Sequence, residues 1–450
     1  MKGRTFLETK VFALKGDILY STDPNRIETH ANSVVVCNGG LTEGVFKELP
    51  AKFAGARLFD FTGRLIIPGM NDLHIHAPQF AFRGLGADLE LLDWLDTFAF
   101  PEEKKYIDPN YAKTAYELFA KDLKLGATTR AAVFATIHMP ATLLLMELLE
   151  ETNLITCVGK VNMDRNAIDG LQEADAAASL AATREWLAEC HAHDFKRTGP
   201  ILTPRFIPSC SPELMRGLGE LHRDDRLPLQ SHLSENTSEI AWVRELCPDA
   251  AFYADAYLRY GTLGGEGLRC IMAHCVHSGA QERALLKRQG VWMAHCPESN
   301  TCLGSGIAPV REFLDEGGNA GLGTDVAGGF SSSMFHTIAE TVKVSKLRRP
   351  LADESSGSPG SPQSPGSPGS PKSPRPVTFE EAFWLATAGG GSFFGKVGKF
   401  EKGYEFDALV LDESAAPHPQ PLSARDRLER TVYLDHDHSV IVKYVGGKRI

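Results

Sequence analysis

Eight short apolar segments, each followed by a longer segment of helical period, constrain the fold of this 450-residue chain more than any other feature. Apolar runs of this kind favour buried strands, and their alternation with helices is typical of repeated βα units around a parallel sheet. The pattern predicts an α/β fold built on a closed (β/α)8 TIM-like barrel. An open doubly wound sheet is the alternative, but no G-x-G-x-x-G motif follows the first strand. The predicted strands are Met70–His76, Ala127–Ala135, Leu154–Val161, Ile201–Ile207, Leu227–Leu233, Cys270–Val276, Val291–Cys296 and Ala320–Thr324.

Two of the intervening helices have clear boundaries. Asp108 can cap a helix over Pro109–Lys124, whose proline suits the first turn, and Gly126 can end it. A second helix is predicted over Ala174–Cys190. The first helix is expected to present one apolar face made of Tyr111, Ala115, Leu118 and Phe119.

Strand-like segments also flank the predicted barrel at both ends of the chain. Each set alone would expose strand edges, so we expect the two ends to pair into one small composite β-sandwich. The resulting domains are an N-terminal sandwich half over residues 1–66, a barrel over 67–398 and a C-terminal sandwich half over 399–450. The strand-like segments are Val11–Leu14, Ser33–Cys37, Arg57–Phe61, Ala408–Leu411, Val432–Leu434 and Ile441–Val445.

Residues 352–376 form a Ser/Pro/Gly-rich insertion within the barrel region. The segment lacks apolar residues that could bury a core, so we predict a disordered loop. Collagen is excluded because Gln363 and Lys372 stand where a triple helix needs glycine. Two interpretations remain open: a tolerated insertion, or a target of proline-directed phosphorylation at serines such as Ser358.

The first predicted strand ends in the H-x-H motif of His74 and His76. Strand alternation points both imidazoles to one side, where they can share a metal ion. Further polar residues end other strands, and such ends meet at one rim of a barrel. They predict a site for a single zinc, iron or similar divalent ion with a position left for water. The further residues are His232 and Glu235 after the fifth strand, His274 after the sixth and Asp325 after the eighth.

Two acids of this group suit proton transfer. A bound divalent ion allows water to ionise near neutral pH, and a side chain must then move the proton. Asp325 can accept that proton, and Glu235 can pass it to a ring nitrogen and then to a leaving group. Capping of the next helix by Asn236 or Thr237 is compatible with this role.

Other histidines are weaker candidates for metal ligands. His191 and His193 repeat the H-x-H spacing, but in a helix their side chains diverge by about 200°. His295 ends the seventh strand and is expected in the core or as a supporting group. His277 is the second choice after His274 for the sixth strand.

Charge and cysteine content limit the function classes. A net charge of −10 without a basic cluster argues against binding to nucleic acid or to an anionic membrane. No apolar run approaches the roughly 20 residues of a transmembrane helix, and no secretory signal is visible. The 9 cysteines show no C-x-x-C spacing, so we interpret them as reduced structural thiols and expect a cytosolic protein.

Several motifs resemble those of the guanine deaminases, a family within the metal-dependent amidohydrolase superfamily. They are PGMNDLHIHAPQ, RFIPSCSPELM, QSHLSEN, MAHCVHS, AHCPESN and LGTDVAGGFSSSMF, joined by PEE, VGKVNMD, EFDALVLD and YVGGK. The resemblance implies zinc-dependent deamination of guanine to xanthine and ammonia in purine catabolism, by a homodimer with one Zn²⁺ per chain. It also implies that metal-activated hydroxide attacks C2 while Glu235 and Asp325 shuttle protons.

The resemblance assigns roles to individual positions. Catalytic roles fall on Glu235, Asp325 and His274. Among the purine-contacting positions, Arg205 can donate to a carbonyl oxygen unless it is a surface ion-pair partner, and Phe206 can stack on a ring. The implied metal ligands are His74, His76, His232, His274 and Asp325. The implied substrate-binding residues are His76, Ala77, Pro78, Gln79, Arg205, Phe206, His232, Leu233, Ser234, Glu235 and Asp325.

One departure from the family pattern and three rival interpretations bear on this assignment. Glu298 replaces the asparagine of the family pattern AHCPNSN, and it either alters substrate contacts or faces solvent. The runner-up function is another amidohydrolase, for example a deaminase of another heterocycle or a two-metal cyclic-amide hydrolase with Lys160 as a carboxylated bridge. A non-catalytic scaffold is disfavoured because all five ligand positions are filled. The cytidine-deaminase type of zinc site is set aside because P-C-x-x-C is missing.

Overall fold

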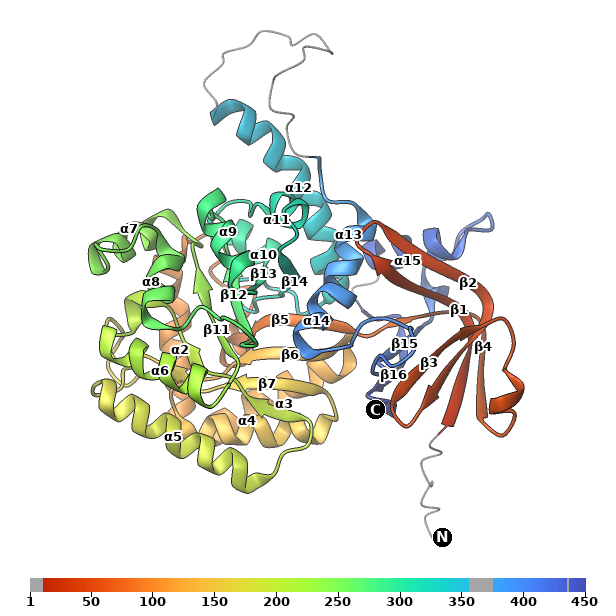
Figure 1. Cartoon of the computed structure of the whole chain (residues 1–450), viewed down its shortest axis with the longest axis horizontal. Coiled ribbons are helices and arrows are strands. Elements are labelled where there is room, and N and C mark those ends of the chain that lie inside the picture. Colours follow the sequence, from red (N-terminus) through yellow and green to blue (C-terminus); the bar gives the residue numbers. More distant parts are fainter. Residues whose placement is uncertain (1–10, 356–374, 435–436) are drawn as a thin grey trace.

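An eight-stranded parallel sheet forms the centre of the molecule (Figure 1). The structure, a computed structural model, describes residues 11–355, 375–434 and 437–450. The strand order is β11-β12-β13-β14-β5-β6-β7-β9, and an isolated parallel bridge joins Leu202, two residues beyond β9, to Leu229 at the start of β11. The strands are β5 (Met70–His76), β6 (Thr128–Phe134), β7 (Ile155–Gly159), β9 (Thr198–Pro200), β11 (Leu229–Leu233), β12 (Cys270–His274), β13 (Trp292–His295) and β14 (Asn319–Leu322), with β8 (Val161–Asn162) and β10 (Thr203–Pro204) paired separately.

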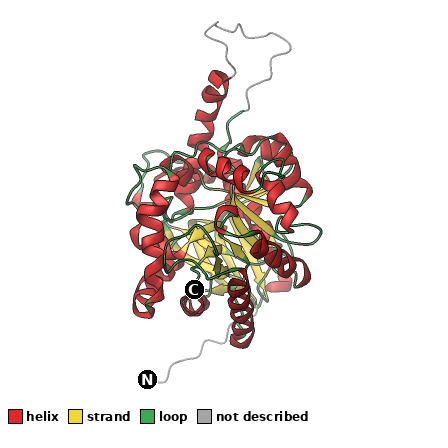
Figure 2. Ribbon diagram, turned by 90° about the vertical axis from the view of Figure 1, so that its left-hand side faces the viewer, coloured by secondary structure: helices red, strands yellow, loops and turns green. Residues whose placement is uncertain are grey.

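Helices surround this sheet on the outside, as the turned view shows (Figure 2). Every residue of β5, β6, β11 and β12 is buried, which is the expected pattern for parallel strands covered on both faces. The helices are α1 (Leu91–Trp94), α2 (Phe100–Lys104), α3 (Pro109–Leu125), α4 (Met139–Thr152), α5 (Ala176–His193), α6 (Pro212–Asp224), α7 (Thr237–Leu246), α8 (Tyr253–Tyr260), α9 (Ala280–Arg288), α10 (Pro297–Cys302), α11 (Val310–Asp315), α12 (Met334–Ser355), α13 (Phe379–Trp384), α14 (Gly390–Phe394) and α15 (Ala424–Leu434).

The boundaries of α3 follow its predicted capping. The Asp108 side chain accepts a hydrogen bond from the backbone N–H of Asn110, and the helix ends at Leu125. Ala115 and Phe119 are buried as predicted, but Leu118 is 55% exposed. The apolar face is therefore narrower than expected, because Leu118 lies beside the buried stripe rather than within it.

Both ends of the chain pair into one seven-stranded sheet of order β17-β16-β15-β4-β1-β2-β3. Leu409 pairs with Ile67 in antiparallel register, so the C-terminal segment joins the N-terminal one as predicted. This sheet lies to one side of the central sheet (Figure 1). Its strands are β1 (Val11–Asp23), β2 (Arg26–Asn38), β3 (Leu41–Phe46), β4 (Arg57–Pro68), β15 (Ala408–Leu411), β16 (Val440–Val445) and β17 (Lys448–Arg449).

Two strand predictions are wrong in detail. The segment predicted as Ile201–Ile207 is only briefly extended, because Pro204 and Pro208 lack the N–H groups that a longer strand needs. Val432–Leu434 is the end of α15, where Leu428 and Val432 are buried on one helical face. A short apolar run cannot by itself distinguish a strand from a helix end.

The predicted disordered insertion falls almost entirely on residues 356–374, which lie outside the described residues. Among the helices that the structure describes, none has the length and apolar character to cross a membrane.

A buried ion pair joins the two sheets. Arg130 on β6 donates from Nε to Asp407 Oδ2 at 2.7 Å, and both side chains are almost fully buried. We expect Arg130→Met to lower the free energy of unfolding by about 3–5 kcal/mol, because Asp407 would remain buried without its partner. Lys113→Met, which removes an exposed pair with Glu117, should change it by less than about 0.5 kcal/mol. Urea unfolding measures both, and equal midpoints for the two variants would contradict the prediction.

Candidate active site

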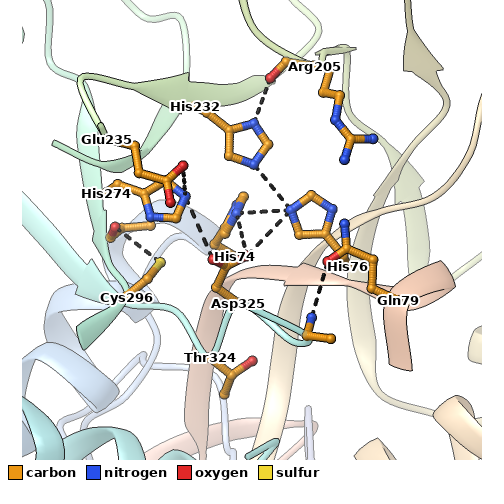
Figure 3. Close-up of polar contacts among 12 residues, drawn as sticks. His74, His76, Gln79, Arg205, His232, Glu235, His274, Cys296, Thr324 and Asp325 are labelled. Atoms are coloured by element: carbon orange, nitrogen blue, oxygen red, sulfur yellow. Dashed lines mark hydrogen bonds and ion pairs between the residues drawn. The ribbon is translucent and has the colours of Figure 1, made fainter. Parts of the chain in front are cut away.

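Four histidines and one aspartate converge where strands of the parallel sheet end (Figure 3). Nε2 of His76 lies 3.2 Å from Nε2 of His74 and 3.2 Å from Nε2 of His232. Asp325 Oδ1 lies 3.1 Å from Nε2 of His74 and 3.4 Å from Nε2 of His76. Its Oδ2 lies 3.8 Å from Nε2 of His274. The structure thus brings all five predicted ligands together.

Hydrogen bonds on the outer side of two rings set their tautomers. Nδ1 of His232 lies 2.6 Å from the Arg205 carbonyl oxygen, and Nδ1 of His274 lies 2.9 Å from Asn300 Oδ1. Because both partners are acceptors, each Nδ1 carries the proton and each Nε2 presents a lone pair to the cluster. Nε2 of His274 is buried without a hydrogen-bond partner among the described residues. Inward-facing nitrogen lone pairs beside one carboxylate fit a divalent ion such as zinc.

Burial controls the charges of these side chains. It lowers the pKa of His74, and it lowers the pKa of His76 and His232 well below the usual value, with neighbouring imidazoles adding to the effect. The rings are therefore neutral at neutral pH, which is the form that binds metals. Burial alone would raise the pKa of Asp325, but the surrounding imidazoles, His74 foremost, hold that pKa well below its ordinary value.

Asp72 fixes the backbone around this cluster. Its Oδ1 accepts hydrogen bonds from the N–H groups of His74 and Thr324, both at 3.1 Å, and its Oδ2 accepts from the Thr324 hydroxyl at 2.6 Å. His274 and Asp325 have φ values of 70° and 49°, in the left-handed region that non-glycine residues rarely adopt. Strained backbone of this kind often marks functional sites.

A cavity opens over the cluster. A concave site with apolar walls and a few converging polar side chains is typical of small-molecule binding. The polar lining comes from His76, Gln79, Arg205, His232, Glu235, His274 and Asp325, and the rest from Leu91, Trp94, Leu95, Phe206, Leu303 and Gly328.

Glu235 reaches into the same cavity and is 4% exposed. Its Oε2 lies 3.5 Å from Nε2 of His274, and its Oε1 accepts a hydrogen bond from the Ser305 hydroxyl at 3.4 Å. Burial raises the pKa of Glu235 well above the usual value, and the charge of Asp325 raises it further. Two carboxyl groups whose pKa values are shifted in opposite directions in one cavity can serve as an acid and a base.

Some implied substrate-binding residues do not line the cavity. Ala77, Pro78, Leu233 and Ser234 are buried beside it, and the Ser234 hydroxyl donates to Glu282 instead. Their side chains therefore support the lining residues rather than form part of the wall.

Other lining residues were not predicted from the sequence. Leu91, Trp94 and Leu95 form one apolar wall, and their i, i+3, i+4 spacing is a helical signal that could have identified them. Cys296, interpreted as structural, lies close enough to His274 and Asp325 to be grouped with them. Burial raises the pKa of its thiol well above the usual value, so it stays protonated.

Glu298, which replaces the asparagine of the family pattern, neither lines the cavity nor faces solvent. The side chain is 5% exposed, outside the cavity lining, and it accepts a hydrogen bond from the Ser331 N–H at 2.8 Å. Its Oε1 also lies 2.5 Å from Nε2 of His336. Glu298 therefore braces the loop after Asp325 instead of facing solvent or substrate.

Three further candidates lie outside the cluster. His295 is buried, and burial lowers its pKa to about 3, in agreement with a core position. His277 bonds the Ser305 carbonyl group through Nε2. Lys160 Nζ lies 2.5 Å from Glu173, so its amine is engaged in an ion pair rather than directed at a metal pair. The two-metal alternative loses its bridging group.

Comparison with known proteins agrees with this geometry. Residues 65–450 match the model of the amidohydrolase family, and the chain belongs to that family. A guanine deaminase of Dictyostelium discoideum is 32% identical over 97% of both chains. A guanine deaminase of Escherichia coli K12 is 34% identical, over 88% of this chain and 84% of its own. The crystal structure of guanine deaminase from C. acetobutylicum, with guanine bound in its active site, has a TM-score of 0.90 and 41% identity, covering 98% of this chain and 100% of its own.

Proposed function

We propose that this chain hydrolyses guanine to xanthine and ammonia. The observation that carries the proposal is a cluster of five metal-type ligands, four of which line one small cavity together with Glu235, a buried carboxyl group of raised pKa. The relatives support the choice of substrate, since guanine occupies the active site of the C. acetobutylicum enzyme.

We infer that one zinc ion per chain belongs in this cluster. Neutral imidazoles with a carboxylate are the ligands that catalytic zinc prefers. When bound, such an ion supplies Lewis-acid chemistry, because it lowers the pKa of a water molecule to about 7. The residues that would hold it are His74, His76, His232, His274 and Asp325.

The two carboxyl groups divide the proton transfers between them. Adding water at C2 and releasing ammonia requires one proton to reach ring nitrogen N3 and a second to reach the amino group. Asp325, ionised at neutral pH, accepts a proton from the attacking water. Glu235, protonated in its buried setting, donates to N3, takes up the second proton of the water from the C2 hydroxyl group and delivers it to the leaving amino group. The proton held by Asp325 then returns to Glu235, which restores both carboxyl groups. His274, whose Nε2 lies 3.5 Å from Glu235, would hold the ion next to this carboxyl group.

The purine itself is held by the other wall of the cavity. Phe206 offers a ring face, and Arg205 offers N–H donors to the carbonyl oxygen of guanine. Gln79 provides both a donor and an acceptor for the ring edge. These contacts orient C2 toward the cluster.

We further propose a barrel architecture, three domains and a homodimeric assembly. The bridge from Leu202 to Leu229 supports closure of the parallel sheet into a (β/α)8 barrel. We assign the domains to residues 1–66, 67–398 and 399–450, with the outer two forming a composite β-sandwich. We also propose a cytosolic homodimer that acts on a small molecule, without a nucleic acid or membrane partner.

One assay tests the proposed activity. Purified, zinc-loaded protein is incubated with guanine, adenine or cytosine, and ultraviolet absorbance and ammonia release are followed. We expect stoichiometric xanthine and ammonia from guanine alone. An inert guanine sample, or preferential conversion of another base, would overturn the proposal.

The hydrogen bond from His274 to Asn300 leads to a prediction about metal affinity. Asn300→Ala removes the acceptor of the Nδ1 proton, so we expect zinc affinity to fall about 10- to 100-fold. Asn319→Ala, at an exposed asparagine, is the matched control and should leave the affinity unchanged. Competition with a chromophoric chelator measures both values. Equal affinities for the two variants would show that the bond does not support the ligand.

A further inference from the structure

Glu103 lies directly behind the cavity wall and has no part in the proposed chemistry. It belongs to α2, is 1% exposed and forms a two-point contact with Arg205. Its Oε2 lies 2.5 Å from Nη1, and its Oε1 lies 3.0 Å from Nη2. The same Oε1 accepts a hydrogen bond from Nε2 of Gln79 at 2.8 Å. One carboxylate therefore binds both polar residues of the substrate wall.

The remaining contacts fix the orientation of each partner. Oε1 of Gln79 accepts a hydrogen bond from the Ala327 N–H at 3.2 Å, so both ends of its amide are defined. The Arg205 guanidinium lies 5.0 Å from the ring centroid of Phe100, one helical turn before Glu103. In Figure 3, Arg205 and Gln79 lie on the His76 side of the site, opposite Glu235 and His274.

The pairing of Glu103 with Arg205 leaves this part of the cavity wall without a net charge. The negative charge of Glu103 balances the positive charge of Arg205 inside a buried wall, so the pair presents N–H donors without a net charge. Two of the five N–H donors of the guanidinium point to Glu103, which leaves others for a ligand. A neutralised donor set of this kind suits a neutral carbonyl oxygen better than an anionic group.

We propose that Glu103 is a positioning residue that determines specificity for a purine carrying a carbonyl group. It holds Arg205 and Gln79 as one rigid recognition unit and does not itself touch the substrate. The inference deepens the proposed guanine deamination and rests on it. In Glu103→Gln, an amide N–H₂ would face the donors of Arg205 or Gln79, so at least one of them must turn away.

Two competitive inhibitors distinguish the positioning role of Glu103 from general damage to the cavity. Hypoxanthine has the carbonyl group of guanine but no amino group to hydrolyse, and purine lacks both. For Glu103→Gln we expect the Ki of hypoxanthine to rise at least about tenfold and the Ki of purine to change less than about threefold. We also expect the loss with guanine to fall mainly on KM, with kcat within about threefold.

Glu102→Gln is the matched control. Glu102 is the neighbouring residue on α2, is 6% exposed and bonds Lys105 and Tyr111 on the side away from the cavity. Its substitution should leave both Ki values unchanged. Zinc content and thermal unfolding check the fold of each variant. If Glu103→Gln fails to fold, Glu103→Asp, which keeps the charge on a shorter side chain, should raise the Ki of hypoxanthine at least about threefold and spare purine.

The outcomes are distinguishable. Equal increases in the Ki values of hypoxanthine and purine would show that Glu103 has a merely structural role. Unchanged Ki values would show that it has no role. Either result overturns the inference and leaves the proposed function intact. Failure of the unaltered protein to convert guanine would instead overturn the proposed function, and the inference with it.

Discussion

Glu235→Gln is expected to lower kcat/KM for guanine by about 10³-fold while the protein keeps its metal, because general acid and base catalysis contributes about 10²–10⁴. The amide has nearly the shape of the carboxyl group but cannot release and recover a proton. Among the described contacts, Glu235 is the carboxyl group that lies within 3.5 Å of His274, and its burial raises its pKa well above the usual value. The rate should therefore fall without a comparable change in the fold.

Absorbance of guanine and xanthine gives the rate, and elemental analysis gives the metal content. Glu245→Gln, on the exposed surface of α7, controls for the substitution itself and should be fully active. Full activity of Glu235→Gln with metal bound would exclude Glu235 as the proton carrier. Loss of metal from this variant would also contradict the account, which gives Glu235 no coordinating role.

Asp325→Asn is expected to have the larger effect, with guanine turnover reduced by at least about 10⁴-fold. The substitution removes both a metal ligand and the acceptor for the first proton. It also removes a negative charge that lies 3.1 Å from His74 and 3.4 Å from His76. We therefore expect weaker metal binding and slower chemistry together, which distinguishes this variant from Glu235→Gln.

Zinc affinity and turnover at saturating zinc are measured separately for this variant. Asp96→Asn, at an exposed position near the cavity wall, is the control and should match the unaltered protein. A variant that regains more than a tenth of the normal rate once zinc is saturating would show that Asp325 acts only as a ligand. Unaltered zinc affinity would show that it is not a ligand.

The sequence predicted the site best where an apolar strand pattern ends in a polar residue. His74 and His76 end a strand whose observed bounds equal the predicted ones, and His232, His274 and Asp325 follow apolar runs in the same way. Because parallel strands end at one edge of a sheet, local patterns placed residues far apart in sequence close together. The resemblance then added the purine-contacting positions, which no local pattern identifies.

The missed features depend on contacts that no local pattern encodes. Glu103 was visible only as part of the PEE motif, and its partners lie 24 and 102 positions away in the chain. Glu298 was expected either to alter substrate contacts or to face solvent, but it is buried and paired with His336. Val432–Leu434 was assigned to a strand because helix ends and short strands share the same apolar pattern.

The most direct test of the central claim is a zinc titration of metal-free protein with guanine as the substrate. The account predicts no xanthine before addition, a rate that rises linearly with added zinc, and a plateau at one equivalent per chain. Xanthine formation by the metal-free protein, a plateau at two equivalents, or no xanthine at any zinc concentration would contradict a single-ion guanine deaminase.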